Sequence, residues 1–432
     1  MLSGMTLTLR LTPLRIVLVL LGCALAVFLA CASAEDPGSL AESPLGATRC
    51  PPCPCLADAG ADAAKHDASP ETGAPDATAG LGKARGTNLA GMEGGWQLAS
   101  STGPVAWTDY PVFDDREIDY FAGKGVTALR VLFSWERVQS SLFGPIPAPG
   151  ANYVAYLANY DRVVSYATSR GMYVIVEPWQ ANSAGDTGGA TWKGQLVGSS
   201  AVPATAFADF WAKMSARYAS NPRVMFGLVN EPNSMSTMAW FSIAQEAINS
   251  IRAAGATNEI LVPGNGWTGG GEWASTWYDT ASPARSNAYG WLNANGPGKP
   301  LFDAFGSIAA EVHVYADANS GGGAPDIASP TVVSDRLNVA VAEGRARGYR
   351  VFLGEVGFCA STAGSATLWK NTEAYFAANA DEVIGWTWWA SGAPGWWSDP
   401  CTSGGGHFSL TPTNASTFTG DTANMAMIEG GF

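Results

Sequence analysis

The chain has 432 residues, 47% of them hydrophobic and 14% charged, so it is long and apolar enough to bury a large core. Its formal net charge of −13 argues against a nucleic-acid partner, because the phosphates would be repelled. The 17 tryptophans and 13 tyrosines offer flat apolar faces that suit an uncharged ligand, although much of this aromatic area must belong to the core.

Residues 1–34 have the pattern of a signal peptide. Arg10 and Arg15 precede an apolar stretch over 16–30, and Ala32-Ser33-Ala34 has the small-x-small form of a cleavage site. A stretch of about 15 apolar residues is short for a transmembrane span. Cys23 and Cys31 each end a sequence that resembles a lipobox, so processing as a lipoprotein is an alternative. We therefore expect a protein that is secreted, or tethered at the cell surface through an N-terminal lipid.

Residues 35–80 contain no aromatic residue and are dominated by Ala, Pro, Gly, Ser and Asp. Such a segment cannot bury enough apolar surface to fold, which predicts a flexible linker. Its cysteines, Cys50, Cys53 and Cys55, could suggest zinc. Three sulfurs in a proline-rich setting, with only the distant His66, make a poor tetrahedral site. Residues 81–432 remain for one folded domain.

From residue 81 onward, segments typical of strands and of helices alternate. The expected strands are 84–90, 126–133, 172–177, 224–229, 259–264, 308–315, 350–355 and 383–389. The expected helices are 113–123, 152–170, 203–220, 236–254, 332–348 and 365–380, with a fifth-unit helix within 272–305 and a last helix within 421–429. Eight such units predict an α/β fold, a single (β/α)₈ TIM barrel. A doubly wound sheet is the rival fold, but residues 91–95 lack the expected G-x-G-x-x-G spacing.

Two glutamates end apolar strands of this barrel. Glu231, in Asn230-Glu231-Pro232, follows the run 224–229, and Glu355 follows 351–354. These positions fit strands four and seven, and TIM barrels carry their active sites at the carboxyl ends of the strands. Paired carboxyls perform acid/base and nucleophilic work in retaining glycosidases. The alternative is that both are ordinary strand-end acids in contact with water.

Two cysteines belong to the folded part. Cys359 lies four residues beyond Glu355, and Cys401 follows the tryptophan-rich strand near 386. These positions place them on adjacent loops at one face of the barrel. We expect a disulfide between them, with two buried thiols as the alternative.

Over about 85–410, the chain resembles glycoside hydrolase family five, in particular its fungal-type endo-β-1,4-glucanases (cellulases). Each motif alone is weak, but their order and spacing are specific. The motifs are Gly86-Thr87-Asn88-Leu89-Ala90-Gly91, Leu129-Arg130-Val131 with Trp135, Phe226-Gly227-Leu228-Val229-Asn230-Glu231-Pro232, Pro263-Gly264-Asn265-Gly266-Trp267, Val312-His313-Val314-Tyr315 and Gly354-Glu355-Val356-Gly357.

The resemblance implies a retaining hydrolase in which Glu231 is the general acid/base and Glu355 the nucleophile. It implies that Asn230 hydrogen-bonds the sugar 2-hydroxyl. Arg130 would contact the nucleophile carboxylate and favour its charged form. A structural ion pair is the plainer interpretation of Arg130.

The resemblance also places His313 and Tyr315 beside the nucleophile, with the tyrosine hydroxyl bonded to it. His313 could instead be a satisfied core residue. Trp389 is implied as the stacking platform at the cleavage point, with Trp388 taking that place if the strand register differs by one. No cofactor and no metal are implied, and we expect a monomer.

One departure from the family concerns the third strand. The family has a His-Asn pair where this chain reads Glu177-Pro178-Trp179-Gln180, so Trp179 occupies the histidine position. Glu177 is then a third carboxylate in the cleft or merely a strand-end acid. Three functions follow: an endo-β-1,4-glucanase; the same chemistry on another β-glycan such as mannan, xyloglucan or a β-1,3-glucan; or a non-catalytic carbohydrate-binding barrel.

Overall fold

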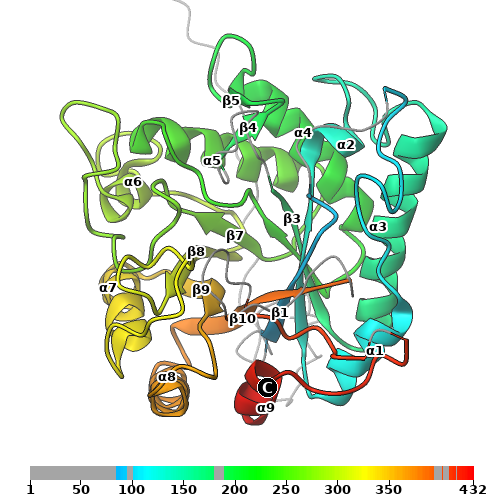
Figure 1. Ribbon diagram of the computed structural model, residues 1–432. Coiled ribbons are helices and arrows are strands. Elements are labelled where there is room, and N and C mark those ends of the chain that lie inside the picture. Colours follow the sequence, from blue (N-terminus) through cyan, green and yellow to red (C-terminus); the bar gives the residue numbers. More distant parts are fainter. Residues whose placement is uncertain (1–83, 95–100, 180–188, 394–400, 402–407, 415) are drawn as a thin grey trace, which may run out of the picture. The chain divides into compact units, whose positions relative to one another are not determined.

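The computed structural model describes residues 84–94, 101–179, 189–393, 401, 408–414 and 416–432. Eight parallel strands close into a barrel in the order β1-β10-β9-β8-β7-β6-β3-β2, with helices around it (Figure 1). The barrel strands are β1 (Ala84–Ala90), β2 (Ala128–Phe133), β3 (Tyr173–Pro178), β6 (Val224–Gly227), β7 (Ile260–Pro263), β8 (Ile308–Tyr315), β9 (Arg350–Gly357) and β10 (Val383–Gly392). The predicted (β/α)₈ barrel is confirmed, and each strand lies where the sequence pattern put it.

The helices follow the prediction equally well. They are α1 (Asp115–Gly123), α2 (Trp135–Val138), α3 (Ala151–Ser169), α4 (Ala204–Tyr218), α5 (Thr237–Ala253), α6 (Asn287–Asn293), α7 (Val332–Arg347), α8 (Ser365–Ala378) and α9 (Ala423–Ile428), with a final 3₁₀ turn at Glu429–Gly431. The sequence did not predict α2 or the hairpin of β4 (Thr191–Trp192) and β5 (Gln195–Leu196), because neither is long enough to show a periodic pattern. None of the helices within the described residues is long and apolar enough to cross a membrane.

Local signals set several helix ends. The Asp114 side chain accepts a hydrogen bond from the Arg116 amide at 2.9 Å, which caps the first turn of α1. Ser236 caps α5 in the same way. Gly348 ends α7 with a φ of 78°, a left-handed conformation that glycine adopts without steric cost.

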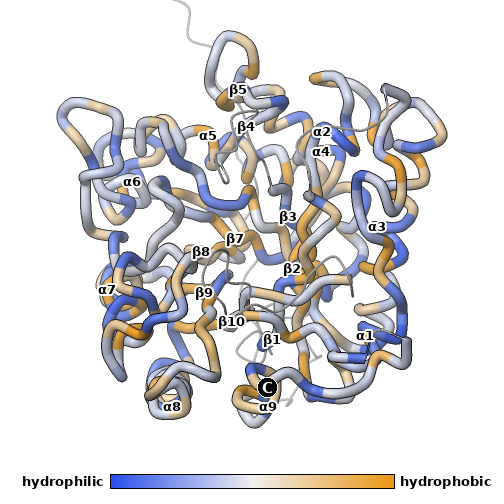
Figure 2. The backbone as a smooth tube through the Cα atoms, in the orientation of Figure 1, coloured by the Kyte–Doolittle hydropathy of each residue, from blue (hydrophilic) through white to orange (hydrophobic). Residues whose placement is uncertain are grey.

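The barrel has an apolar layer inside it and a second apolar layer outside. One residue from each barrel strand contributes to the inner cluster, which comprises Ala84, Ala128, Ile175, Met225, Leu261, Ala309, Phe352 and Ile384. A larger cluster of buried residues involves the strands together with the surrounding helices. Figure 2 shows this as hydrophobic colour along central strands such as β2 and β3. The strands are therefore buried on both faces, as expected for an all-parallel barrel.

A charged layer lies directly above the inner apolar layer. Side chains on a strand alternate with a period of two, so the residue two positions after an inward-facing one also faces inward. After Ala128, Ile175 and Ala309, these next inward positions are Arg130, Glu177 and Glu311. All three are completely buried. Gly227 and Gly354 lie beside the two carboxylates, and a Cβ atom at either glycine would collide with them. The two glycines thus leave space for the Glu177 and Glu311 carboxylates toward the carboxyl ends of the barrel strands.

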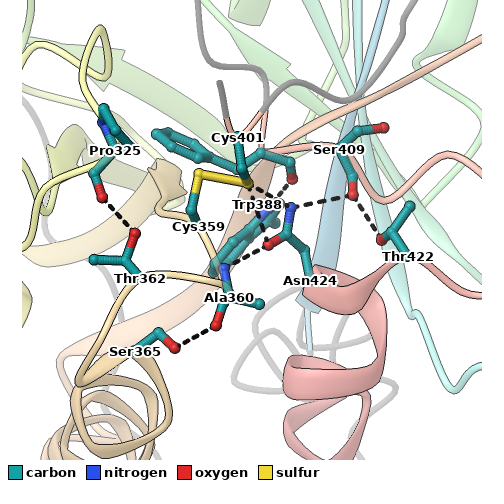
Figure 3. The surroundings of a disulfide bond; sticks show 11 residues. Pro325, Cys359, Ala360, Thr362, Ser365, Trp388, Cys401, Ser409, Thr422 and Asn424 are labelled. Carbon is teal, nitrogen blue, oxygen red and sulfur yellow. Dashed lines mark hydrogen bonds between the residues drawn. A yellow bond between two sulfur atoms is a disulfide. The ribbon is translucent and has the colours of Figure 1, made fainter. Parts of the chain in front are cut away.

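A disulfide joins the segments that follow β9 and β10. Cys359 and Cys401 are bonded with their Cα atoms 5.4 Å apart, which confirms the predicted pairing (Figure 3). The Asn424 carboxamide, at the start of α9, accepts from the Ala360 amide at 2.8 Å, next to the bridge. Trp388 is buried here and donates from Nε1 to the Phe408 carbonyl at 2.6 Å. The disulfide therefore fastens two loops at the barrel end where Glu355 lies.

Candidate active site

The Glu355 carboxylate is buried and is hydrogen-bonded through both of its oxygens. Arg130 Nη1 donates to its Oε1 at 2.9 Å, and the Tyr315 hydroxyl donates to its Oε2. Glu355 is only 2% exposed. Burial raises its pKa, and the nearby Glu231 adds to this, while His313, Arg130 and Tyr315 act in the opposite direction. The expected contacts of Arg130 and Tyr315 with this carboxylate are present.

Glu231 lies across from Glu355 and more open to solvent. It follows β6 with a φ of 48°, a left-handed conformation that is uncommon for a residue with a side chain and frequent at functional sites. Its Oε1 lies 2.7 Å from His313 Nδ1, and the same nitrogen lies 3.4 Å from Glu355 Oε2. His313 therefore bridges the two glutamates from β8.

The charge state of His313 follows from its three carboxylate neighbours. Burial disfavours its charged form, but Glu355, Glu231 and Glu311 outweigh that effect and raise the pKa of His313 to about 10. His313 Nε2 is buried without a hydrogen bond and lies 3.6 Å from Glu311 Oε1. A protonated imidazole thus lies between the two glutamates.

Arg130 organises the floor of the site. Its guanidinium donates to Glu177 through Nε at 2.8 Å and Nη2 at 2.5 Å, and its Nε lies 3.0 Å from Glu311. Burial raises the pKa of Glu177 to about 8, and the neighbouring Glu311 adds to this against the effect of Arg130. Glu177 is neither a cleft carboxylate nor a strand-end acid in contact with water; it is a completely buried partner of Arg130.

Asn230 is oriented by the same guanidinium. Its Oδ1 accepts from Arg130 Nη2 at 2.7 Å, and because arginine can only donate, the amide nitrogen must point the other way. That nitrogen, Nδ2, is buried and has no hydrogen-bond partner. Asn230 therefore presents an unused donor, as a contact with a sugar hydroxyl requires.

Two tryptophans form an aromatic wall at this site. Trp179 and Trp389 are stacked, with ring centroids 5.4 Å apart and an angle of 21° between the planes. Trp389 follows Trp388 in β10, and the next peptide bond, Trp389–Ala390, is cis. Trp388 has its ring completely buried against Phe408 and Phe358, so Trp389 is the inward-facing residue of the two. The indole of Trp179, at the position where the family resemblance predicts a histidine, therefore lies against Trp389.

A cavity of about 600 Å³ opens beside Glu231. His313 and Tyr315 line its inner side, while Trp267 and Trp277 form its outer wall as a stacked pair with ring centroids 6.4 Å apart. Trp277 is 65% exposed, and its Nε1 donates to Glu272 at 2.8 Å. Exposed, held indole rings beside a polar pocket are suited to the apolar faces of sugar rings.

Sequence reasoning missed some members of this site. Glu311 could have been found, since Glu311, His313 and Tyr315 alternate on one face of β8. Asn88, whose Oδ1 accepts from Arg130 at 2.7 Å, lies in the motif of the first strand, but its residue type alone does not indicate this contact. Trp277 carries no sequence signal, because it lies in an irregular loop. Gln180 lies outside the described residues.

Comparison with known proteins identifies the family. The model of the cellulase family, glycosyl hydrolase family 5, matches residues 83–393. Endo-beta-1,4-glucanase B of Aspergillus niger is 30% identical over 336 residues, which cover 78% of this chain and 87% of that protein. The chain belongs to glycosyl hydrolase family 5. It is accordingly a glycoside hydrolase.

Solved structures of family 5 enzymes agree with this. The endo-beta-1,4-glucanase of Xanthomonas axonopodis pv. citri superimposes with a TM-score of 0.68 at 32% identity, covering 80% of this chain and 97% of that one. XacCel5A in complex with cellopentaose gives 0.69 at 31% identity, covering 82% and 100%. These structures share the barrel of this family 5 member.

Glu231, His313 and Glu355 could also hold a metal ion, since one ligand atom from each lies within 4.8 Å of the others. The carboxylate and imidazole donors are compatible with several divalent cations. The expectation that the chemistry needs no metal and no cofactor stays a prediction.

Proposed function

We propose that this family 5 hydrolase is a retaining endo-β-1,4-glucanase with Glu231 as general acid/base and Glu355 as nucleophile. One observation carries the proposal: oxygen atoms of Glu231 and Glu355 lie within 4.8 Å of each other. Retaining glycosidases separate their carboxyl groups by about 5–5.5 Å, while inverting enzymes need about 6.5–9.5 Å to admit a water. The short separation supports a double displacement.

In the first step, the Glu355 carboxylate attacks the anomeric carbon while Glu231 gives its proton to the leaving oxygen. Tyr315 and Arg130 hold one oxygen of Glu355 each, which orients the nucleophile. In the second step, Glu231 removes a proton from a water that hydrolyses the glycosyl-enzyme. His313 contacts both carboxylates, and the charges of these two groups change between the two steps.

The Glu231 side of the site is the leaving-group side, because the acid must reach the leaving oxygen. The cavity with Trp267 and Trp277 lies on that side and would receive the released part of the chain. Asn230 Nδ2 would donate to the 2-hydroxyl of the sugar at the cleavage point, and Trp389 would stack beneath it. Cleavage within the polysaccharide chain is supported by the similarity to endo-β-1,4-glucanases and to XacCel5A, which has been solved in complex with cellopentaose.

Trp179 favours a second candidate function, in which the preferred substrate is a β-glycan other than β-1,4-glucan. Its ring stacks on Trp389 where the family has a hydrogen-bonding imidazole, so it adds apolar area and removes a polar partner. Losing a hydrogen bond to a desolvated hydroxyl costs about 1–3 kcal/mol. The preferred β-glycan would then be one whose ring or branch suits an aromatic neighbour.

The setting that fits this function is outside the cytoplasm. The signal-peptide pattern of 1–34 and the Cys359–Cys401 disulfide both support export. We propose a monomer with a polysaccharide substrate, secreted or tethered through an N-terminal lipid on the linker 35–80.

The test combines two variants with a polysaccharide panel. Wild type should release reducing sugar from carboxymethyl-cellulose or a related β-glucan, and NMR should show the β-anomer first. Glu355→Gln should lose several orders of magnitude in kcat on every substrate. Glu231→Gln should lose most on substrates with poor leaving groups, since good leaving groups need no proton.

Three outcomes would contradict the proposal. They are more than a tenth of wild-type activity in folded Glu355→Gln, the α-anomer appearing first, or equal losses for Glu231→Gln on both kinds of leaving group. A panel without any cleavage would favour a non-catalytic carbohydrate-binding barrel instead. A clear preference for mannan, xyloglucan or a β-1,3-glucan, lost in Trp179→His, would favour the second substrate class.

A further inference from the structure

A second aromatic pocket lies apart from the leaving-group cavity. It has a volume of about 480 Å³, and its lining includes Trp107, Phe418, Asp114, Asp115 and Arg162. Trp107 is 58% exposed, although a tryptophan ring is among the costliest side chains to leave in water. None of these residues takes part in the chemistry proposed above.

The position of this pocket follows from the barrel topology. Trp107 belongs to the segment between β1 and α1, and Ala393, which also lines the pocket, directly follows β10. The strands β1 and β10 are neighbours, and their carboxyl ends pair at Ala90 and Gly392. The pocket is thus at the same end of the barrel as Glu355.

The order of the strands places the two aromatic sites on opposite sides of the barrel mouth. In the closed ring of eight, β1 and β10 lie across from β6 and β7. Glu231 follows β6 and Trp267 follows β7, so the leaving-group cavity starts on that far side. A linear glycan that enters over Trp267 and passes Glu355 is therefore directed toward β1 and β10.

Hydrogen bonds of the surrounding turn fix the backbone that carries Trp107. Its amide donates to the Tyr110 carbonyl at 2.7 Å, and the Val105 amide donates to the Asp109 carboxylate at 2.7 Å, so the turn is closed by its own hydrogen bonds. Trp107 has a φ of 63°, which a tryptophan rarely adopts. Backbone strain that a surrounding structure maintains is typical of binding sites. The turn therefore presents the exposed Trp107 ring at the edge of the pocket.

The charges of the pocket cancel in pairs. Asp114 accepts from Arg116 Nε at 3.0 Å and from Nη2 at 2.7 Å, and Arg116 also lies over the Phe418 ring. Asp115 is paired with Arg162. These side chains are all part-exposed, so their remaining donors and acceptors can reach a ligand. A flat apolar ring beside compensated polar groups suits an uncharged polyhydroxyl ligand.

We infer that the Trp107 pocket is a distal subsite that binds the non-leaving end of the same polysaccharide chain that is cleaved at Glu355. This inference rests on the proposed function, because it takes the substrate to be a linear β-glycan. Trp107 would stack on one sugar ring, and the Asp115–Arg162 pair would hydrogen-bond its hydroxyls. The subsite would raise affinity for long chains and leave short ones unaffected.

The experiment compares long and short substrates in the same variant. We expect Trp107→Ala to lower the ratio of kcat/KM for cellohexaose to kcat/KM for an aryl cellobioside by roughly two- to tenfold, as the loss of one aromatic contact predicts. Phe302→Ala is the matched control. Phe302 is 62% exposed but precedes β8, at the opposite end of the barrel, so this variant should keep the wild-type ratio.

A binding measurement separates this inference from the proposed function. Cellohexaose binding to Glu355→Gln and to Glu355→Gln with Trp107→Ala can be followed by calorimetry, which needs no turnover. Weaker binding in the double variant supports the subsite even if wild type cleaves another glycan. An unchanged ratio with unchanged binding overturns it, and so does an equal loss on both substrates. Loss of adsorption to insoluble cellulose alone would assign the pocket to a second chain and overturn it as well.

Discussion

Replacing Asn230 by alanine tests whether the buried amide recognises the sugar in the transition state. The variant deletes Nδ2, which is buried and unpartnered, and Oδ1, which accepts from Arg130 at 2.7 Å. Arg130 Nη2 keeps Glu177 as a second acceptor at 2.5 Å, so no charge is left unpaired. Loss of one hydrogen bond to a charged group then costs at least about 1.5 kcal/mol of stability, and the barrel should still fold.

The loss of activity should be much larger than the loss of stability. Removing a preorganised donor that acts on the transition state in a water-excluded site raises the activation free energy by about 2.7–4 kcal/mol. Since 1.36 kcal/mol corresponds to a factor of ten, kcat/KM should fall roughly 100- to 1,000-fold. The hydrogen bonds of the 2-hydroxyl strengthen in the transition state of retaining enzymes, so kcat should carry most of this loss.

A substrate without the hydroxyl makes the test specific. Wild type and Asn230→Ala are assayed on an aryl cellobioside and on its analogue that lacks the 2-hydroxyl at the cleavage point, with the same leaving group. The variant should be much slower than wild type on the first substrate and nearly equal to it on the second. The same loss on both substrates would refute the contact and point to a displaced Arg130 or Glu355 instead.

Three further predictions concern single groups of the fold. Tyr315→Phe removes the hydroxyl that donates to Glu355 and lowers its pKa, so the acidic limb of kcat/KM should move to higher pH; an unmoved limb would contradict this. Glu117 is completely buried with neither oxygen bonded, and burial, with a smaller effect from Asp114, raises its pKa well above the ordinary value. The wild-type protein therefore loses stability as the pH rises from the ordinary pKa of a glutamate toward the raised pKa of Glu117. The Tm of Glu117→Gln relative to that of wild type should increase from pH 5 to pH 9. A Tm difference that does not change with pH would contradict this prediction. Replacing both Cys359 and Cys401 by serine should lower the free energy of unfolding by about 4 kcal/mol, from a sequence separation of 42, and should make the Tm insensitive to reductant; a Tm equal to that of the oxidised wild type would argue against the bridge.

The sequence alone determined the barrel and the pair of glutamates. Apolar runs and helical patterns alternate eight times, and each run must be buried on both faces, which only a parallel sheet covered by helices satisfies. Glu231 and Glu355 follow two of these runs directly, so the fold itself brings them to one end of the barrel. Both patterns are local in the sequence, so they can be recognised without knowledge of any long-range contact.

Only the tertiary structure decided the positions of several other groups around that pair. The sequence predicted Glu177 as a third carboxylate in the cleft or a strand-end acid, yet closure of the barrel buries it against Arg130 from the adjacent strand. Trp277 and Trp107 lie in irregular segments, whose positions no periodic pattern predicts. Their roles depend on which strands close the ring.

The choice between Trp388 and Trp389 shows the physical reason most clearly. Alternation along a strand says that one of two neighbours faces inward, but it does not say which. The pairing of β10 with β9 shifts register between Val383 and Gly385, where β10 has an extra residue, so counting from the start of the strand gives no reliable parity. Hydrogen bonds between strands far apart in the sequence fix that register, and they turn Trp389 toward Trp179.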